Sequence, residues 1–250
     1  MNVLLFLCPA LFLSGFVDSV AGGGGLISMP AILLTGLPLQ QVYGINKFTA
    51  ASGTTFSAIR YFRHGAVDIK IALLSACGAF LASSFSSRAV LFLPERLLKG
   101  ALLCLMPIVV VLILMKKKGN DTNRSTEIPI KKRYLMGFLI GMIVGCYDGL
   151  FGPGTGTIAI LVYCYLMKYD MKTAGGNAKI LNLASNYAAL VTYILAGTIN
   201  YAIAVPAACC CIVGNLIGSG LALKKGSVVI RPIMLVVAAL LIGKTVMDFF

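Results

Sequence analysis

Charged residues are scarce in this sequence: they make up 12% of its 250 residues, and Asp and Glu together number only 8. A soluble domain needs roughly a quarter to a third of its surface residues charged, so this scarcity excludes an ordinary soluble fold. The sequence instead has 59% hydrophobic residues, more than a domain of this size can bury. A bilayer removes that limit, because lipid tails solvate an apolar exterior. The composition therefore predicts an all-α integral membrane protein.

Catalytic and metal-binding motifs are also missing. The one histidine, His64, lies beside Arg60 and Arg63 and is predicted to belong to a solvated cluster of positive charge. No HExxH, P-loop or serine–histidine–acid set occurs, so we predict neither an enzyme nor a bound metal or cofactor. The cysteines form no CxxC pair and lie mostly inside apolar runs, which favours small buried residues at helix interfaces. They are Cys8, Cys77, Cys104, Cys146, Cys164, Cys209, Cys210 and Cys211.

Long polar segments are absent as well, and the longest one, at 116–133, is too short to fold as a soluble domain. The net charge of +13 comes from short basic clusters between apolar runs. This pattern is typical of cytoplasmic loops under the positive-inside rule, and we expect no nucleic-acid partner. The apolar N-terminus lacks a basic start, so it is predicted to be a retained first span rather than a cleaved leader.

Ten apolar segments follow one another along the chain, and most approach the roughly 20 residues that cross a ~30 Å hydrocarbon layer. Two are shorter, and each follows a glycine-rich stretch. In lipid, irregular backbone survives only where protein or a water-filled cavity satisfies its hydrogen bonds, so these two are expected inside the bundle. The segments are 3–17, 26–36, 45–63, 69–87, 94–115, 134–150, 156–167, 175–197, 201–222 and 229–249.

The sequence is predicted to consist of two copies of one unit, a first repeat at 1–115 and a second at 134–250, joined by a basic linker at 116–133. An ordered series of matches supports the duplication. At an offset of 130 the matched residues are Gly15, Asp18, Gly22 and Gly24 with Gly145, Asp148, Gly152 and Gly154. At an offset of 132, Lys47 matches Lys179 and Gly65 matches Gly197.

Lysine and arginine predict the orientation. The linker is rich in both and is expected in the cytoplasm of a cell whose inner or plasma membrane holds the protein. If all ten segments cross the membrane, most basic residues lie on the cytoplasmic side. If the two short segments are re-entrant, the basic residues are divided almost evenly between the two sides. Five segments per half is an odd number, so the halves are predicted to be inverted, with the N-terminus outside. A dozen helical residues span only about 18 Å. Eight full spans plus two short glycine-broken helices satisfy both constraints, as in many secondary transporters.

The two glycine-rich stretches are the first candidate site. A glycine stretch that opens onto a helix leaves backbone N–H groups available, and the helix dipole adds positive potential there. Two such ends that meet near the midplane would hold an anion; the alternative is that the glycines only allow close helix packing. The candidates are Gly22, Gly23, Gly24, Gly25, Gly152 and Gly154, with hydroxyl donors from Ser28, Thr155 and Thr157.

Equivalent charged residues flank these stretches. Lys47 and Lys179 are expected either to face the protein interior and attract an anion or to extend to the interface from a helix end. Asp18 and Asp148 are candidates for ion coupling, and the alternatives are pairing with the lysines or capping the short helices. Amides inside a span need partners. Those expected to face the cavity or the opposite half are Asn46, Asn177, Asn182 and Asn186.

Several of these motifs resemble the sulfite exporter TauE/SafE family, and the resemblance covers nearly the whole chain. It is carried by Asp18-Ser-Val-Ala-Gly-Gly-Gly-Gly-Leu-Ile-Ser-Met-Pro30, Gly44-Ile-Asn-Lys-Phe-Thr and Phe62-Arg-His-Gly-Ala-Val-Asp68, and in the second half by Gly176-Asn-Ala-Lys-Ile-Leu-Asn-Leu-Ala-Ser-Asn186 and Ala196-Gly-Thr-Ile-Asn200. It implies a multi-pass permease for small anions, often sulfur-containing ones such as sulfite, sulfonates or thiosulfate.

The sequence therefore predicts a secondary transporter that works by alternating access, with a small anion as its substrate and a proton or sodium as the candidate coupling ion. A homo-oligomer is compatible with this. Two other classes stay open: a cation or metal permease that uses Asp18 and Asp148, and a membrane scaffold that transports nothing.

Overall fold

The computed structural model describes residues 3–94, 122–236 and 239, which are helical without a strand. The segment predicted at 94–115, Cys104 and the end of the segment predicted at 229–249 lie outside these residues. In the first half the helices are α1 (Val3–Ala21), α2 (Gly25–Leu33), α3 (Leu39–Arg63) and α4 (Ile69–Phe92). After a 3-10 turn, η1 (Ser125–Glu127), follow α6 (Ile130–Leu150), α7 (Thr155–Leu166), α8 (Met171–Leu195) and α9 (Tyr201–Lys225), then an apolar helix at Ser227–Val236.

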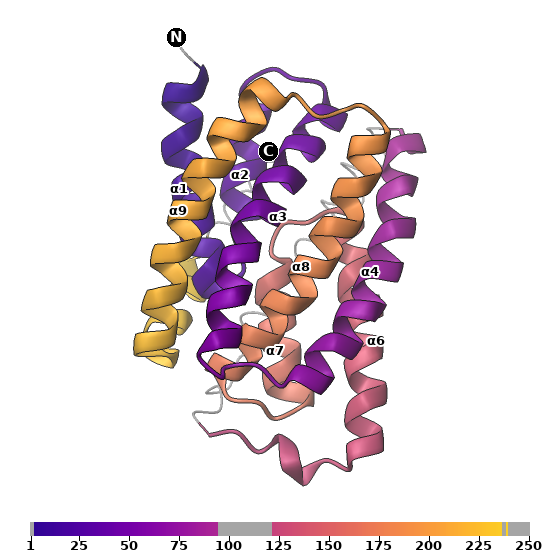
Figure 1. Ribbon diagram of the computed structural model, residues 1–250, viewed down its shortest axis with the longest axis vertical. Helices are drawn as coiled ribbons and strands as arrows, with labels where there is room; N and C mark the ends of the chain where they lie inside the picture. The colour runs from indigo at the N-terminus through magenta and orange to yellow at the C-terminus, as the bar shows by residue number, and fades with distance from the viewer. Residues whose placement is uncertain (1–2, 95–121, 237–238, 240–250) are drawn as a thin grey trace.

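The long helices run side by side in two opposite directions. In Figure 1, α1, α3 and α9 run down the view, whereas α4, α6 and α8 run up. Glycines with a left-handed backbone conformation form the turn that precedes each short helix. Gly22, before α2, has a φ of +76°, and Gly152 and Gly154, before α7, have φ of +85° and +79°. After these turns α2 and α7 fold back along the helices that precede them. Each pair, α1 with α2 and α6 with α7, is therefore a helical hairpin.

Small residues allow the helices to touch backbone to backbone. A Cβ added to Gly141 of α6 would lie 2.1 Å from the carbonyl oxygen of Ser75 in α4. On the other side of the bundle, a Cβ on Gly214 of α9 would lie 2.0 Å from the carbonyl oxygen of Phe12 in α1. Such contacts replace the hydrophobic effect as the force between helices, because lipid is as apolar as the helix surface.

The outer surface of the bundle is apolar. Large side chains such as Leu5, Phe85, Ile143 and Leu195 are more than two-thirds exposed, and α1, α4 and α9 are each long and apolar enough to cross a membrane. This surface is what a multi-pass membrane protein presents to lipid. The prediction that the cysteines fill helix interfaces is wrong for three of them. Cys164 and Cys211 are buried, but the exposed ones are Cys77, Cys146 and Cys209.

Basic residues gather at one end of the bundle, the lower end in Figure 1, where α3, α7 and α9 finish and α4, α6 and α8 begin. The last turns of α3 and α9 contain Arg60, Arg63, Lys224 and Lys225. The other basic residues at or beside helix ends there are Lys70, Arg124, Lys131, Lys132, Arg133, Lys168 and Lys172. We call this the basic end.

Candidate functional site

The tips of the two helical hairpins meet inside the bundle. The carbonyl oxygen of Gly22 accepts a hydrogen bond from the backbone N–H of Gly156 at 3.1 Å, and Thr157 Oγ1 donates to the carbonyl oxygen of Ala21 at 2.7 Å. A Cβ on Gly22 would lie 2.3 Å from Gly156. Only glycine therefore permits the two turns to approach this closely, and their irregular backbone is satisfied by protein rather than by lipid.

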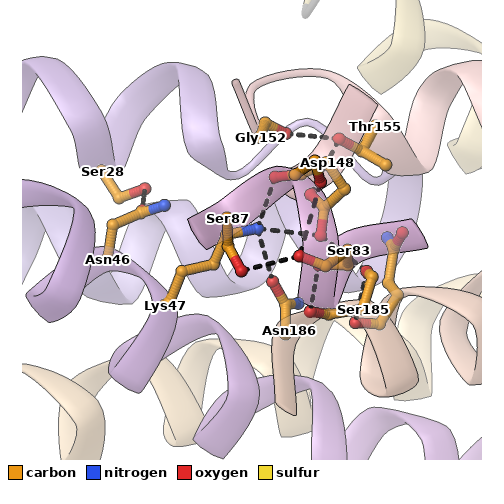
Figure 2. A network of polar contacts seen from close by, with 12 residues as sticks. Ser28, Asn46, Lys47, Ser83, Ser87, Asp148, Gly152, Thr155, Ser185 and Asn186 are labelled. Atoms are coloured by element: carbon orange, nitrogen blue, oxygen red, sulfur yellow. Dashed lines mark hydrogen bonds and ion pairs between the residues drawn. The ribbon is translucent and has the colours of Figure 1, made fainter. Parts of the chain in front are cut away.

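Lys47 of α3 and Asp148 of α6 form a buried ion pair beside these tips (Figure 2). Lys47 Nζ lies 2.8 Å from Asp148 Oδ2 and also donates to the Asp148 carbonyl oxygen and to Asn186 Oδ1. The carboxylate accepts two further hydrogen bonds, from Thr155 Oγ1 at 2.9 Å and from Ser185 Oγ at 2.6 Å. The side chains are 1% and 5% exposed. Because nearly every polar atom has a partner, the burial of these charges is tolerated.

Lys179 of α8 and Asp18 of α1 form the second buried pair. Lys179 Nζ lies 2.8 Å from Asp18 Oδ2 and also donates to the Asp18 carbonyl oxygen. The lysine is 1% exposed, but the aspartate side chain is 20% exposed. Each lysine is thus paired with the aspartate of the other half of the chain. The two lysines lie in the protein interior and do not extend to the ends of the bundle.

A small cavity of about 30 Å³ lies between the hairpin tips and the two ion pairs, room for one or two water molecules. It lies beside the N-termini of α2 and α7, where helix dipoles favour negative charge. Most of the residues predicted for the site line it. They are Asp18, Gly22, Gly24, Gly25, Ser28, Asn46, Lys47, Asp148, Gly152, Thr155, Asn182 and Asn186.

The other predicted residues lie outside the cavity lining. Gly23 is in the turn between α1 and α2, and Gly154 is the residue that precedes α7. Thr157 joins the two hairpin tips, and Lys179 lies behind Asp18. Asn177 points elsewhere: its Oδ1 accepts a hydrogen bond from the backbone N–H of Asp68, in the connection between α3 and α4.

The structure adds lining residues that the sequence analysis did not select. Ser14 lies one turn before Asp18 and donates to the carbonyl oxygen of Gly24 at 2.9 Å. Thr49 and Cys211 also line the cavity. The helical spacing from Asp18 to Ser14 and from Asn46 to Thr49 and Ala50 is a signal that could have indicated this face. Nothing in the sequence near Cys211 indicates that α9 reaches the site.

A second polar cluster lies at the basic end and joins the two halves. Arg133 Nη2 lies 2.6 Å from Asp68 Oδ2, which also accepts a hydrogen bond from Tyr169 OH at 2.6 Å. Burial raises the pKa of Tyr169 to about 12, so its phenol stays protonated and donates throughout the physiological pH range. We call Asp68, Arg133 and Tyr169 the Asp68 cluster.

Buried charges held between glycine-broken helices, inside an apolar bundle, define a multi-pass membrane protein of the transporter class. The family comparison makes this specific, because residues 7–245 match the family described as sulfite exporter TauE/SafE. The chain belongs to this family and is a membrane transporter.

Curated relatives agree with this assignment. A "Probable membrane transporter protein" of Haemophilus influenzae is 30% identical over 99% of this chain and 96% of its own length. "Probable membrane transporter protein YfcA" of Escherichia coli K12 is 30% identical over 99% of this chain and 90% of its own. "Probable membrane transporter protein YdhB" of Bacillus subtilis is 22% identical over 88% and 87%. No solved structure matches the chain significantly. The relatives are described as transporters, and their names specify no substrate.

Proposed function

We propose that this protein is a secondary transporter of small anions, with sulfur-containing ions such as sulfite, sulfonates and thiosulfate as the substrate class. One observation carries the proposal: Lys47 and the N-termini of two short helices meet at a buried cavity, and Lys179 lies directly behind Asp18, which lines that cavity. Lysine and the positive end of a helix dipole both favour an anion. Ser28, Asn46 and Thr155 add short polar side chains around the same space.

The cavity supports an alternating-access mechanism. The cavity is small, at about 30 Å³, so a sulfur oxyanion is expected to enter after one half has moved against the other. The opposite directions of corresponding helices, such as α3 and α8 in Figure 1, support inverted repeats with eight full spans and two short helices. In the proposed mechanism the two halves rock about the site that they share.

Orientation follows from the basic end, which we assign to the cytoplasm of a cell whose inner or plasma membrane holds the protein. The N-terminus then lies outside. A reporter fused at Met1 is expected to be active only outside the cytoplasm, and a cytoplasmic signal would contradict the inverted arrangement.

Transport itself is tested with purified protein in liposomes. Radiolabelled sulfite and thiosulfate are expected to enter, and Lys47→Ala and Lys179→Ala are each expected to abolish the flux. Flux of divalent metals in place of anions would favour a cation permease. A scaffold would be favoured if no small anion entered the liposomes and both lysine variants gave the same ligand-induced thermal shift as the unaltered protein.

A further inference from the structure

We propose that the two ion pairs have different functions: Asp18 accepts a proton and releases Lys179 to the anion, while Lys47 and Asp148 stay paired throughout. This inference rests on the proposed function and assigns the coupling to one of two otherwise similar carboxylates. It names the proton as the coupled ion and Lys179 as the residue that receives the substrate.

The hydrogen bonds of the two carboxylates differ. Asp148 accepts from two hydroxyls in addition to its lysine. In the described part of the chain, the Asp18 carboxylate accepts only from Lys179. Residue types at corresponding positions of the two halves account for this difference. Thr155 follows Asp148 by seven residues, and Gly25 follows Asp18 by the same seven. Ser185 follows Lys179 by six residues, and Gly53 follows Lys47 by the same six.

Hydrogen bonds donated to a carboxylate stabilise its ionised form. The two hydroxyls bind the Asp148 carboxylate, and the glycines at the corresponding positions near Asp18 offer it no such donors. Asp18 is also the more accessible group, with 20% of its side chain exposed against 5% for Asp148. Of the two, Asp18 is therefore the carboxylate to which the proton is assigned.

The cavity also contains an acceptor without a donor. Asn182 lines the cavity and is 4% exposed, and its Oδ1 has no hydrogen-bond partner within the described chain. Asp18 lines the same cavity. A protonated carboxyl carries an O–H donor that its ionised form lacks, so proton binding at Asp18 supplies a donor to a space that needs one.

The step is balanced in charge and protons. A proton from solution binds an Asp18 carboxylate oxygen, and the Lys179 N–H groups transfer their hydrogen bonds from that oxygen to the arriving anion. On release, the anion and the proton leave, and the Asp18–Lys179 pair forms again. Across the helices packed near Asp18, the titratable neighbours are Lys179 of α8, Tyr61 of α3 and Cys211 of α9, with Lys47 and Asp148 across the cavity; α2 contributes none.

The experiment is calorimetric titration of detergent-purified full-length protein with thiosulfate, which stays ionised at neutral pH, over a pH series. In the unaltered protein the affinity is expected to fall about tenfold per pH unit on the alkaline side, as linkage to one proton requires. Asp18→Asn mimics the protonated carboxyl, so its affinity is expected to be independent of pH. Asp148→Asn is the matched control and is expected to keep the wild-type slope, whatever its absolute affinity.

A second variant tests the same idea without altering either carboxylate. Ser185→Ala removes a hydroxyl donor from Asp148 and is expected to keep the slope of the unaltered protein, because Asp148 stays paired with Lys47 and releases no lysine to the anion; a changed slope would contradict the assignment. A pH-independent Asp148→Asn with a sloping Asp18→Asn would overturn the assignment. An affinity for thiosulfate that depends on the sodium concentration, tested by replacing sodium with choline, and that does not depend on pH would also overturn the assignment. Absence of thiosulfate or sulfite binding in every variant would instead refute the proposed function.

Discussion

At the scale of single residues, the Lys47–Asp148 pair makes a strong prediction about stability. Removing one partner of a buried pair leaves an uncompensated charge, so Lys47→Met is expected to lower the free energy of unfolding by about 3–5 kcal/mol. The double variant Lys47→Met, Asp148→Asn is expected to recover much of that loss. Thermal unfolding in detergent measures both.

The exposed pair of Lys168 with Glu127 is the control for this prediction. Its members lie in water at the basic end, where solvent screens the attraction, so Lys168→Met is expected to leave the unfolding temperature close to that of the unaltered protein. A Lys47→Met variant as stable as Lys168→Met would show that the buried pair contributes nothing to the fold.

The sequence analysis selected the four charged residues that form the two buried pairs, but it left their partners open. Lys47 and Lys179 were recognised because a lysine inside an apolar run is rare. Their spacing along the chain carries no information on whether the side chain reaches an aspartate 101 or 161 residues away, because that depends on how the hairpins cross. For the same reason Asn177 was placed in the site, although its partner is the backbone of Asp68.

At the scale of elements, the hairpin tips depend on glycine for two separable reasons. Gly22 and Gly36 both have a φ of +76°, but a Cβ on Gly22 would lie 2.3 Å from Gly156, whereas one on Gly36 has nothing within 4 Å. Gly36→Ala therefore measures the backbone strain alone, roughly 1–2 kcal/mol. Gly22→Ala is expected to lose this and about 1–3 kcal/mol more from crowding. Equal losses in thermal unfolding would mean that the tips are not in contact.

Helix positions followed from hydropathy better than helix ends did. The apolar segments predicted at 45–63 and 175–197 belong to α3 and α8, which begin earlier, at Leu39 and Met171. Their first turns are polar or mixed, and hydropathy does not detect a helix that extends beyond its apolar part. The start of α8 is instead fixed by Asp170, whose carboxylate accepts hydrogen bonds from the backbone N–H groups of Lys172 and Thr173. The cysteines were misplaced because a thiol is acceptable in lipid as well as in a helix interface.

At the scale of the whole molecule, the Asp68 cluster fastens the two halves together at the basic end. Asp68→Asn keeps the cap at the start of α4, since asparagine also caps helices well, but it removes the charge that binds Arg133. Opening at this end is expected to become easier. In a variant whose sole cysteine is Cys211, labelling by a charged maleimide from the basic end is expected to accelerate about tenfold, the effect of ~1.4 kcal/mol on a two-state equilibrium.

Glu127→Gln is the control for the labelling experiment, because it removes an acidic residue from the same end without touching the Asp68 cluster. Its labelling rate is expected to match that of the unaltered protein. Equal rates in Asp68→Asn and Glu127→Gln would show that the cluster does not hold the basic end closed.

The two buried pairs also determine how the empty protein responds to voltage. Lys47 and Lys179 are balanced by Asp148 and Asp18, so the cavity has no net charge when it is empty. One elementary charge that crosses a membrane potential of 100 mV involves about 2.3 kcal/mol of electrical work. A cavity without net charge that changes its opening from one side of the membrane to the other involves no such electrical work. In the proposed mechanism the membrane potential therefore leaves the return of the empty carrier unaffected and acts only on the charges of the bound anion and its proton.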